Sequence, residues 1–406
     1  VTNLDDIDYS TINNMEVIKG PAATMYGGGV GGVVRLYTNT SEEKGVFLEQ
    51  KTIGGSYGLL QSNSKLDVVN DKSSTSVNFS HLQSDGYRPH GASLKNYFTV
   101  YSKINLTDSQ TLSIFGSHNF SHDEVSGQIS YADYYAGIDN GNSAYIKKNA
   151  RNDFFSDRVG LNYSVKMKHN LSWSTIGFFS NVNSKRVAAG ADENSTTQNY
   201  GLRSILSWKT QLDKYWKYDV SLGTEIQQTQ SLISNYRFTG TVDSIPLQVQ
   251  SITAGSYFKY FNNQYSFFTT NRFTFEPLQL TFLVGLSANT ISYNRNDLLS
   301  APGLLTGYNK DLSLSKSFDF VFNPHFAIQK EYKNQIFNLS YSEGYNAPTS
   351  GTTFISGINK VNDSLQPEKA RMIDFSIQGL LENTKLDYQV SIFSIFVRNK
   401  LTTLSG

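Results

Sequence analysis

Apolar and polar side chains alternate with a period of two along most of this chain, from about residue 45 onward. Between Val159 and Met167, the odd positions carry Val, Leu, Tyr, Val and Met, whereas the even positions carry Gly, Asn, Ser and Lys. Phe318, Phe320 and Phe322 likewise share one parity. Successive side chains of a strand point to opposite faces, so each such segment predicts a β-strand with one apolar and one polar face. We expect about fifteen strands, at 45–54, 59–70, 73–84, 94–106, 110–122, 154–167, 170–184, 199–212, 215–230, 262–275, 278–292, 315–330, 335–345, 370–381 and 385–398.

The connectors between these segments alternate in length. The short ones are polar and lie at 70–72, 107–109, 168–170, 213–214, 276–277, 333–334 and 382–384. The others are mostly long and lie at 85–93, 123–153, 185–198, 231–261, 293–314 and 346–369. Short turns at one end of a meander and long loops at the other are typical of an outer-membrane β-barrel, whose closed sheet satisfies every backbone hydrogen bond in lipid. Trp173, Trp208 and Trp216 lie near strand ends, where such barrels carry aromatic girdles.

A soluble β-sandwich, propeller or adhesin is the alternative fold, since its strands also alternate when one face packs on a core. Several of the expected strands are much longer than the roughly 5–6 residues that are usual in globular proteins. Soluble folds also rarely separate long and short loops to opposite ends over so many strands. The pattern therefore favours an all-β fold, an antiparallel transmembrane β-barrel in the outer membrane of a bacterium.

Composition narrows the function further. Lys and Arg number 35 and Asp and Glu 34, so the net charge of +1 provides no field for holding nucleic acid. The absence of cysteine excludes a disulfide scaffold, a thiolate zinc site and a cysteine nucleophile. No apolar run is long enough for a membrane helix, and no signal peptide opens the chain. The first residues resemble the interior of a domain and the last three, from Leu404 to Gly406, do not resemble a natural ending, so we expect a fragment that is cut at both ends.

The first forty residues break the alternating pattern. A short strand at 14–19 is followed by a glycine-rich turn and a second apolar strand ending near Leu36. Glycine permits positive φ and close backbone approach. A phosphate-binding loop is disfavoured, because no Gly-Lys-Ser/Thr sequence follows and no helix is indicated after the glycines.

The run from Val17 to Val34, VIKGPAATMYGGGVGGVV, resembles the end of the plug domain of TonB-dependent outer-membrane receptors. The residues that carry this plug motif are Gly20, Pro21, Tyr26, Gly27, Gly31 and Gly32. A second stretch, GYNAPT from Gly344 to Thr349 with LQPEK from Leu365, is similar to the family's G-F-R-A-P-T and L-x-P-E motifs, although Tyr345 and Asn346 replace the usual Phe-Arg pair.

This resemblance implies a barrel of about 22 strands whose lumen is filled by a plug. Residues 1–42 would be the C-terminal part of the plug domain, and residues 43–406 a partial barrel. About seven strands would then be missing, together with the segment that contacts the TonB complex.

Candidate chemistry is sparse. His118 and His122 share one strand face beside Asp123 and Glu124, but residues four apart on a strand are about 13 Å apart, too far for one ion. No Ser-His-Asp set or carboxylate pair stands out, so we expect no enzyme activity, no metal site and no cofactor.

Binding residues are expected in the long loops, where aromatic and basic side chains gather. These residues suit an anionic, aromatic chelate through stacking and cation–π contacts, and they also suit sugars. The ligand-binding candidates are Tyr87, Arg88, His90, Tyr131, Tyr134, Tyr135, Tyr236 and Arg237.

The resemblance therefore implies an active transporter energised by the TonB complex, with a ferric siderophore or similar iron complex as cargo. Cobalamin, oligosaccharide or peptide uptake is the alternative. A passive porin-like channel would leave the glycine-rich segment without a role, a barrel enzyme would need catalytic groups at its rim, and a soluble adhesin remains a further alternative. The expected partners are the TonB complex, the small ligand and outer-membrane lipid.

Overall fold

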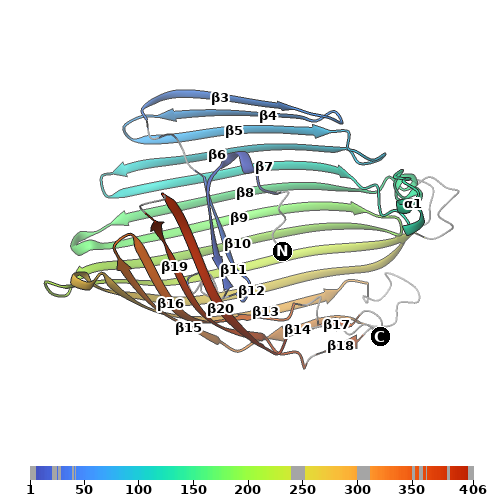
Figure 1. The fold of residues 1–406 in the computed structure, drawn as a ribbon. Helices are drawn as coiled ribbons and strands as arrows, with labels where there is room; N and C mark the ends of the chain where they lie inside the picture. The colour runs from blue at the N-terminus through green and yellow to red at the C-terminus, as the bar shows by residue number, and fades with distance from the viewer. Residues whose placement is uncertain are drawn as a thin grey trace.

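Consecutive strands pair with each other in one sixteen-stranded antiparallel sheet, in which β14 lies off the main path and pairs with β13 (Figure 1). The computed structural model describes residues 6–20, 25, 29–38, 41, 43–238, 252–299, 311–349, 353–355, 360–362, 364–381 and 385–400. Two further pairs, β1 with β2 and β17 with β18, form separate two-stranded sheets among these residues. The predicted antiparallel meander is thus confirmed.

Every expected strand has a counterpart in this sheet. The N-terminal hairpin is β1 (Ile12–Lys19) and β2 (Gly32–Thr38), preceded by the 3-10 turn η2 (Tyr9–Thr11). The first half of the sheet comprises β3 (Gly45–Gly54), β4 (Leu60–Val69), β5 (Ser73–Ser84), β6 (Ser93–Thr107), β7 (Gln110–Glu124), β8 (Arg151–Lys166), β9 (Leu171–Val187) and β10 (Ala191–Gln211). The second half comprises β11 (Trp216–Phe238), β12 (Ile252–Phe275), β13 (Leu280–Asp297), β14 (Leu314–Ser317), β15 (Val321–Tyr332), β16 (Gln335–Asn346), β19 (Glu368–Leu381) and β20 (Leu386–Arg398). The remaining elements are α1 (Tyr131–Tyr135), α2 (Ser143–Lys147), η5 (Lys168–Asn170), η7 (Glu276–Leu278), β17 (Phe354–Ile355) and β18 (Lys360–Val361).

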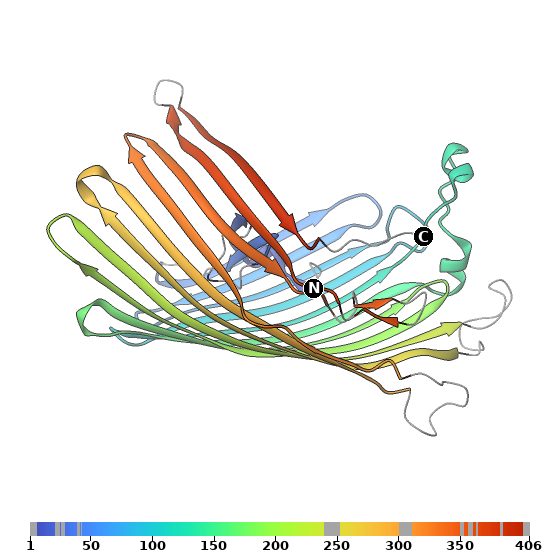
Figure 2. The same ribbon diagram turned by 90° about the horizontal axis from the view of Figure 1, so that it is seen from below.

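The sheet curves into a trough, with β3 and β20 at its two edges and the β1–β2 hairpin on its concave side (Figure 2). Within the described residues, no helix is long and apolar enough to cross a membrane.

Burial is reversed relative to a soluble sheet. The convex face exposes large apolar side chains, among them Leu161 at 49%, Phe322 at 60% and Val390 at 58%. The concave face buries small polar ones, such as Ser287 and Asn289, both at 0%. Exposed apolar area costs about 25 cal/mol per Å² in water, so these rows require an apolar surrounding. They do not meet each other across a dry interior, which excludes the sandwich.

A band of aromatic side chains runs along the short-turn end of strands β8 to β12. Trp173 lies 6.1 Å from Tyr163 and Trp208 lies 6.3 Å from Tyr218, measured between ring centroids. Trp216 contacts Phe275 at 5.0 Å. Amphipathic rings favour the boundary between lipid and water, so this band agrees with the girdle predicted from the three tryptophans.

One expected long loop is wrong. Residues 185–198 were expected to form a loop, but β9 continues to Val187 and β10 starts at Ala191, so only a tight turn separates the two strands. Polar side chains occupy both faces of the two strands here, so the sequence shows no alternation of apolar and polar residues that would indicate a strand. The backbone ladder persists regardless, because its hydrogen bonds do not depend on an apolar face.

The expected strand 315–330 is interrupted. Ser317 pairs with Ser292 while Val321 pairs with Asn289, so one extra residue lies in the strand opposite β13. Such a bulge reverses which parity faces inward. Phe318 consequently packs 6.1 Å from the buried Tyr293 ring, whereas Phe320 is 48% exposed. The two side chains therefore lie on opposite faces, although their shared parity predicted one face.

Candidate functional site

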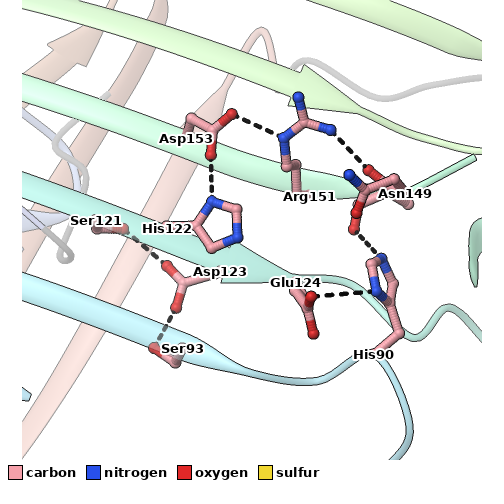
Figure 3. Close-up of polar contacts among 10 residues, drawn as sticks. His90, Ser93, Ser121, His122, Asp123, Glu124, Asn149, Arg151 and Asp153 are labelled. Atoms are coloured by element: carbon pink, nitrogen blue, oxygen red, sulfur yellow. Dashed lines mark hydrogen bonds and ion pairs between the residues drawn. The ribbon is translucent and has the colours of Figure 1, made fainter. Parts of the chain in front are cut away.

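Two of the predicted loops are joined at the long-loop end of the sheet (Figure 3). His90, between β5 and β6, contacts the Ala150 carbonyl through Nε2 at 2.8 Å, and its Nδ1 lies 3.4 Å from Glu124. Ser126 donates to the His90 carbonyl at 3.1 Å. A second bridge is the ion pair between Arg88 and Asp139, at 2.6 Å. His90 and Arg88 therefore hold the β5–β6 loop against the β7–β8 loop.

A polar cluster lies beside this junction (Figure 3). Asp153 accepts from Arg151 at 2.9 Å and lies 2.5 Å from His122 Nδ1. His118 has its own partner, Asp157, at 2.7 Å. Each histidine thus contacts a separate carboxylate, and the described residues hold no group of three or more His, Cys, Asp or Glu arranged to bind a metal.

A tyrosine cluster covers the short helix α1 in the β7–β8 loop. The helix begins where Ser130 accepts from the Asp133 amide at 3.1 Å. The Tyr131 and Tyr135 hydroxyls lie 3.0 Å apart, and the Tyr134 ring lies 5.5 Å from that of Tyr135. The hydrogen bond with Tyr135 favours the neutral phenol of Tyr131 and raises its pKa. All three rings are strongly exposed, which leaves their faces open to a planar or sugar-like ligand.

The other candidates are more scattered. Tyr87 is 67% exposed and packs edge-on against Tyr57 at 5.6 Å. Tyr236 borders a groove on the convex side of β9–β12, away from the concave face. Arg237 lies within β11, and its side chain is outside the described residues. The structure thus joins the first two loops through Arg88 and His90, whereas Tyr236 borders a groove that it shares with Asp153.

The glycines of the N-terminal motif have definite steric roles. Gly20 has φ +67°, and a Cβ there would lie 2.5 Å from the Met372 sulfur of β19. Gly32 has φ +101°, and its Cβ would meet the Ile18 carbonyl oxygen at 2.1 Å. Gly31 faces open space. Pro21, Tyr26 and Gly27 lie outside the described residues.

Two aspartates ahead of β1 fasten the N-terminal segment to the concave wall. Asp6, only 3% exposed, forms an ion pair with Arg158 of β8 and accepts from Asn119 Nδ2 at 3.2 Å. Asp8 accepts from Ser80 of β5 at 2.8 Å. A buried carboxylate must be paired, so these contacts fix where the segment meets the sheet.

A third attachment on β10 was not predicted from the sequence. Arg203 donates to Glu225 at 2.6 Å and to the Met25 carbonyl at 2.7 Å, and its guanidinium stacks on Phe268 at 4.8 Å. The tip of the Phe268 ring covers Gly223, where an added Cβ would lie 2.1 Å from Cζ of the ring. The sequence does contain a sign of this attachment, namely an inward-facing glycine, Gly223, close to an arginine on the neighbouring strand. The sign can be recognised only when the register between the two strands is known.

Below Met25, the concave face encloses a cavity of about 800 Å³ toward the short-turn end. Its lining is rich in hydroxyl groups and includes two lysines that face inward, Lys103 and Lys166. The lining also includes apolar side chains, among them Val165, Trp173 and Ile205, so the cavity wall is mixed in polarity.

Residues 63–406 match the family described as TonB dependent receptor-like, beta-barrel. The fold is similar to that of the unliganded ferric citrate transporter FecA, with a TM-score of 0.79, 15% identity, and coverage of 98% of this chain and 58% of that one. It is also similar to the alcaligin outer-membrane receptor FauA from Bordetella pertussis (TM-score 0.73, 12% identity, 97% and 58% coverage) and to the siderophore receptor PiuA from Acinetobacter baumannii (0.76, 13%, 94% and 62%). The chain therefore spans about three-fifths of the length of these structures. The match over most of the sequence shows that the chain belongs to the TonB-dependent receptor β-barrel family, whose members are proteins of the bacterial outer membrane.

Proposed function

We propose that the whole protein is a TonB-dependent active importer and that its cargo is a ferric siderophore or a similar iron complex. Family membership supports the transporter class. The similar structures named above are a ferric citrate transporter, an alcaligin receptor and a siderophore receptor, and these names support the cargo class.

The observation that carries the proposal is the attachment of the N-terminal segment to the concave wall. Contacts run from Asp6 to Arg158 and from Met25 to Arg203, on strands β8 and β10. A passive channel gains nothing from a segment fastened across its interior. We infer that residues 1–42 are the C-terminal part of a plug, that residues 43–406 form the surrounding wall, and that the TonB complex supplies the work to move the plug.

The extracellular loops supply the chemistry for capture. Tyr131, Tyr134 and Tyr135 present exposed ring faces, and the loop carrying Tyr87, Arg88 and His90 is fastened to the same β7–β8 loop through Asp139 and Ser126. Aromatic faces stack on catecholate-like or other planar groups, and cations attract an anionic complex. Tyr236 and Arg237, at the long-loop end of β11, would contact cargo only outside the barrel opening.

Uptake by living cells tests this function. A strain that lacks the full-length gene is supplied with ferric siderophores labelled with radioactive iron, and the gene is then restored with or without a functional TonB complex. We expect uptake only when both are present, and a triple substitution of Tyr131, Tyr134 and Tyr135 by Ala should weaken binding while surface amounts stay normal.

Replacement of the exposed Ile138 by Ala in the same loop is the matched control. Uptake that persists without the TonB complex would instead identify a passive channel. Uptake of cobalamin, an oligosaccharide or a peptide without any iron complex would replace the cargo class and leave the transporter class intact.

A further inference from the structure

The β7–β8 loop contains the single Asn-Gly pair of the sequence, Asn140-Gly141. In such a pair, the side-chain carbonyl carbon of asparagine and the backbone nitrogen of the next residue can join in a five-membered ring. Glycine favours this ring closure, because it has no Cβ that would obstruct the approach to its nitrogen. Asparagine is accordingly one of the thermolabile residues of proteins. In a folded protein, the contacts that hold these two groups decide whether the ring forms.

Both reacting groups are unconstrained in this loop. The Asn140 side chain is exposed and lies in irregular chain between α1 and α2. Within the part of the chain that the structure describes, neither this side chain nor the Gly141 N–H takes part in a hydrogen bond. Gly141 has φ +72°, a left-handed conformation that glycine adopts without strain. The side-chain amide can therefore turn toward the Gly141 nitrogen without breaking a hydrogen bond.

The residues on either side of the pair are fixed. The Ile138 amide donates to a carbonyl of α1 at 2.9 Å, and the Asn142 amide donates to the Ser126 carbonyl at 2.6 Å. The Asp139 carboxylate forms the ion pair with Arg88 at 2.6 Å. These contacts confine local motion to the pair itself, and they place any chemical change in the pair directly beside the ion pair that joins the two loops.

The comparable positions in the two loops are protected by their contacts. Asn142 Oδ1 accepts from an amide of α2 at 3.0 Å, and its Nδ2 donates to the Gln128 carbonyl at 3.2 Å. The related pair Asp85-Gly86 is also constrained, because the Gly86 amide donates to Ser84 Oγ at 3.2 Å. The structure therefore distinguishes the Asn-Gly pair from these positions by the freedom of its two reacting groups.

We propose that Asn140 is a site of spontaneous deamidation, which changes the charge of the β7–β8 loop over time. The Gly141 nitrogen attacks Cγ of Asn140, and the proton of that nitrogen leaves with the side-chain nitrogen as ammonia. The resulting succinimide ring then takes up one water molecule and opens to aspartate or isoaspartate. The net reaction consumes water and releases ammonia, so it needs no oxidant, reductant or cofactor, and it does not depend on the cargo.

The product adds a negative charge beside the junction of the two loops. The new carboxylate repels the Asp139 carboxylate and competes with it for the Arg88 guanidinium. Opening to isoaspartate also lengthens the backbone by one atom, which alters the path between Asp139 and the anchored Asn142. We therefore expect the β5–β6 and β7–β8 loops to separate more easily in the converted protein.

Mass spectrometry of the native full-length protein tests this site. The purified protein is incubated at mildly alkaline pH in heavy-oxygen water, and its peptides are then prepared in ordinary water. Only conversion in the native protein incorporates heavy oxygen, which separates it from conversion during peptide preparation. We expect heavy oxygen at Asn140 to exceed that at Asn142 by about tenfold or more, because the hydrogen bonds that hold the Asn142 amide must break first.

Asn140→Gln is the matched control, because its longer side chain closes the ring far more slowly, and heavy oxygen should be lost from this peptide. Asn140→Asp carries the charge of the product from the start and should make the β7–β8 loop more sensitive to limited proteolysis than Asn140→Gln does. Equal sensitivity of these two variants would overturn the predicted effect on the junction. Conversion of Asn140 that does not exceed that of Asn142 in the native protein would overturn the proposal itself.

Discussion

The Val30 amide donates a hydrogen bond to the Asn346 side chain at 3.5 Å, across 316 positions of sequence. Asn346 also donates to Glu368 at 3.3 Å. Val30 belongs to the glycine-rich N-terminal motif, and Asn346 and Glu368 belong to the second motif. The two stretches that resemble the family in sequence therefore touch in space, and one amide side chain connects them.

Asn346→Ala should loosen the N-terminal segment. The substitution removes both hydrogen bonds, each of which contributes about 1 kcal/mol on average. Limited proteolysis of the full-length protein should then cut near the glycine-rich run faster than in wild type. Asn346→Gln retains the amide and tests whether its position matters. Identical cleavage of wild type and Asn346→Ala would mean that the contact does not hold the segment.

Arg158→Ala should leave the buried carboxylate of Asp6 unpaired. Breaking a buried ion pair from one side costs about 3–5 kcal/mol, and we expect the lower end because the Arg158 side chain keeps 31% exposure. Urea unfolding of the full-length protein measures the loss. The double variant Asp6→Asn, Arg158→Ala should recover part of it, because no buried charge remains. Equal losses in the single and double variants would contradict the pairing.

Gly223→Ala should destabilise the wall because the new methyl group would overlap the Phe268 ring. Overpacking of this kind typically costs about 1–3 kcal/mol. Adding Phe268→Leu should relieve the clash, so the two effects should be less than additive. Gly116→Ala is the control, since a Cβ at Gly116 meets nothing within 4 Å. Equal unfolding midpoints for the two alanine variants would contradict the predicted overlap.

Tyr135→Phe should lower the pKa of Tyr131 toward its ordinary value. The hydrogen bond with Tyr135 favours the neutral phenol and is the main cause of the raised pKa. NMR titration of ring-labelled tyrosine between neutral and strongly alkaline pH follows the group directly. Tyr134→Phe removes a neighbouring hydroxyl without touching this bond and should leave the titration in place. A Tyr131 titration that Tyr135→Phe does not move would assign the shift to another cause.

The sequence was sufficient to predict the strands and their lipid-facing rows, because alternation reports directly which face meets lipid. It was less informative beyond the membrane. The turn after Val187 was missed because both faces of β9 and β10 are wet there, so no apolar parity marks the strand. Phe318 was placed on the wrong face because a one-residue bulge changes parity without changing composition.

The attachments of the N-terminal segment were harder to foresee. Arg203 and Gly223 lie on different strands, and their shared contact with Phe268 follows from register, which alternation alone does not set. Asp6 and Asp8 lie in a stretch without a periodic pattern, so nothing in the sequence distinguishes them from exposed polar residues. The loop tyrosines were recognisable as a group, but the helix that gathers them is only five residues long and carries too little periodicity to predict.

The position of Asp6 and Asp8 ahead of β1 sets the order in which the segment yields to mechanical tension. A pull applied from the amino-terminal side would load the contacts with Arg158 and Ser80 before it reached the paired strands behind them. If the segment is extracted in this way, its attachments would break one at a time, and the force required at any moment would be that of a single contact rather than of the whole buried surface.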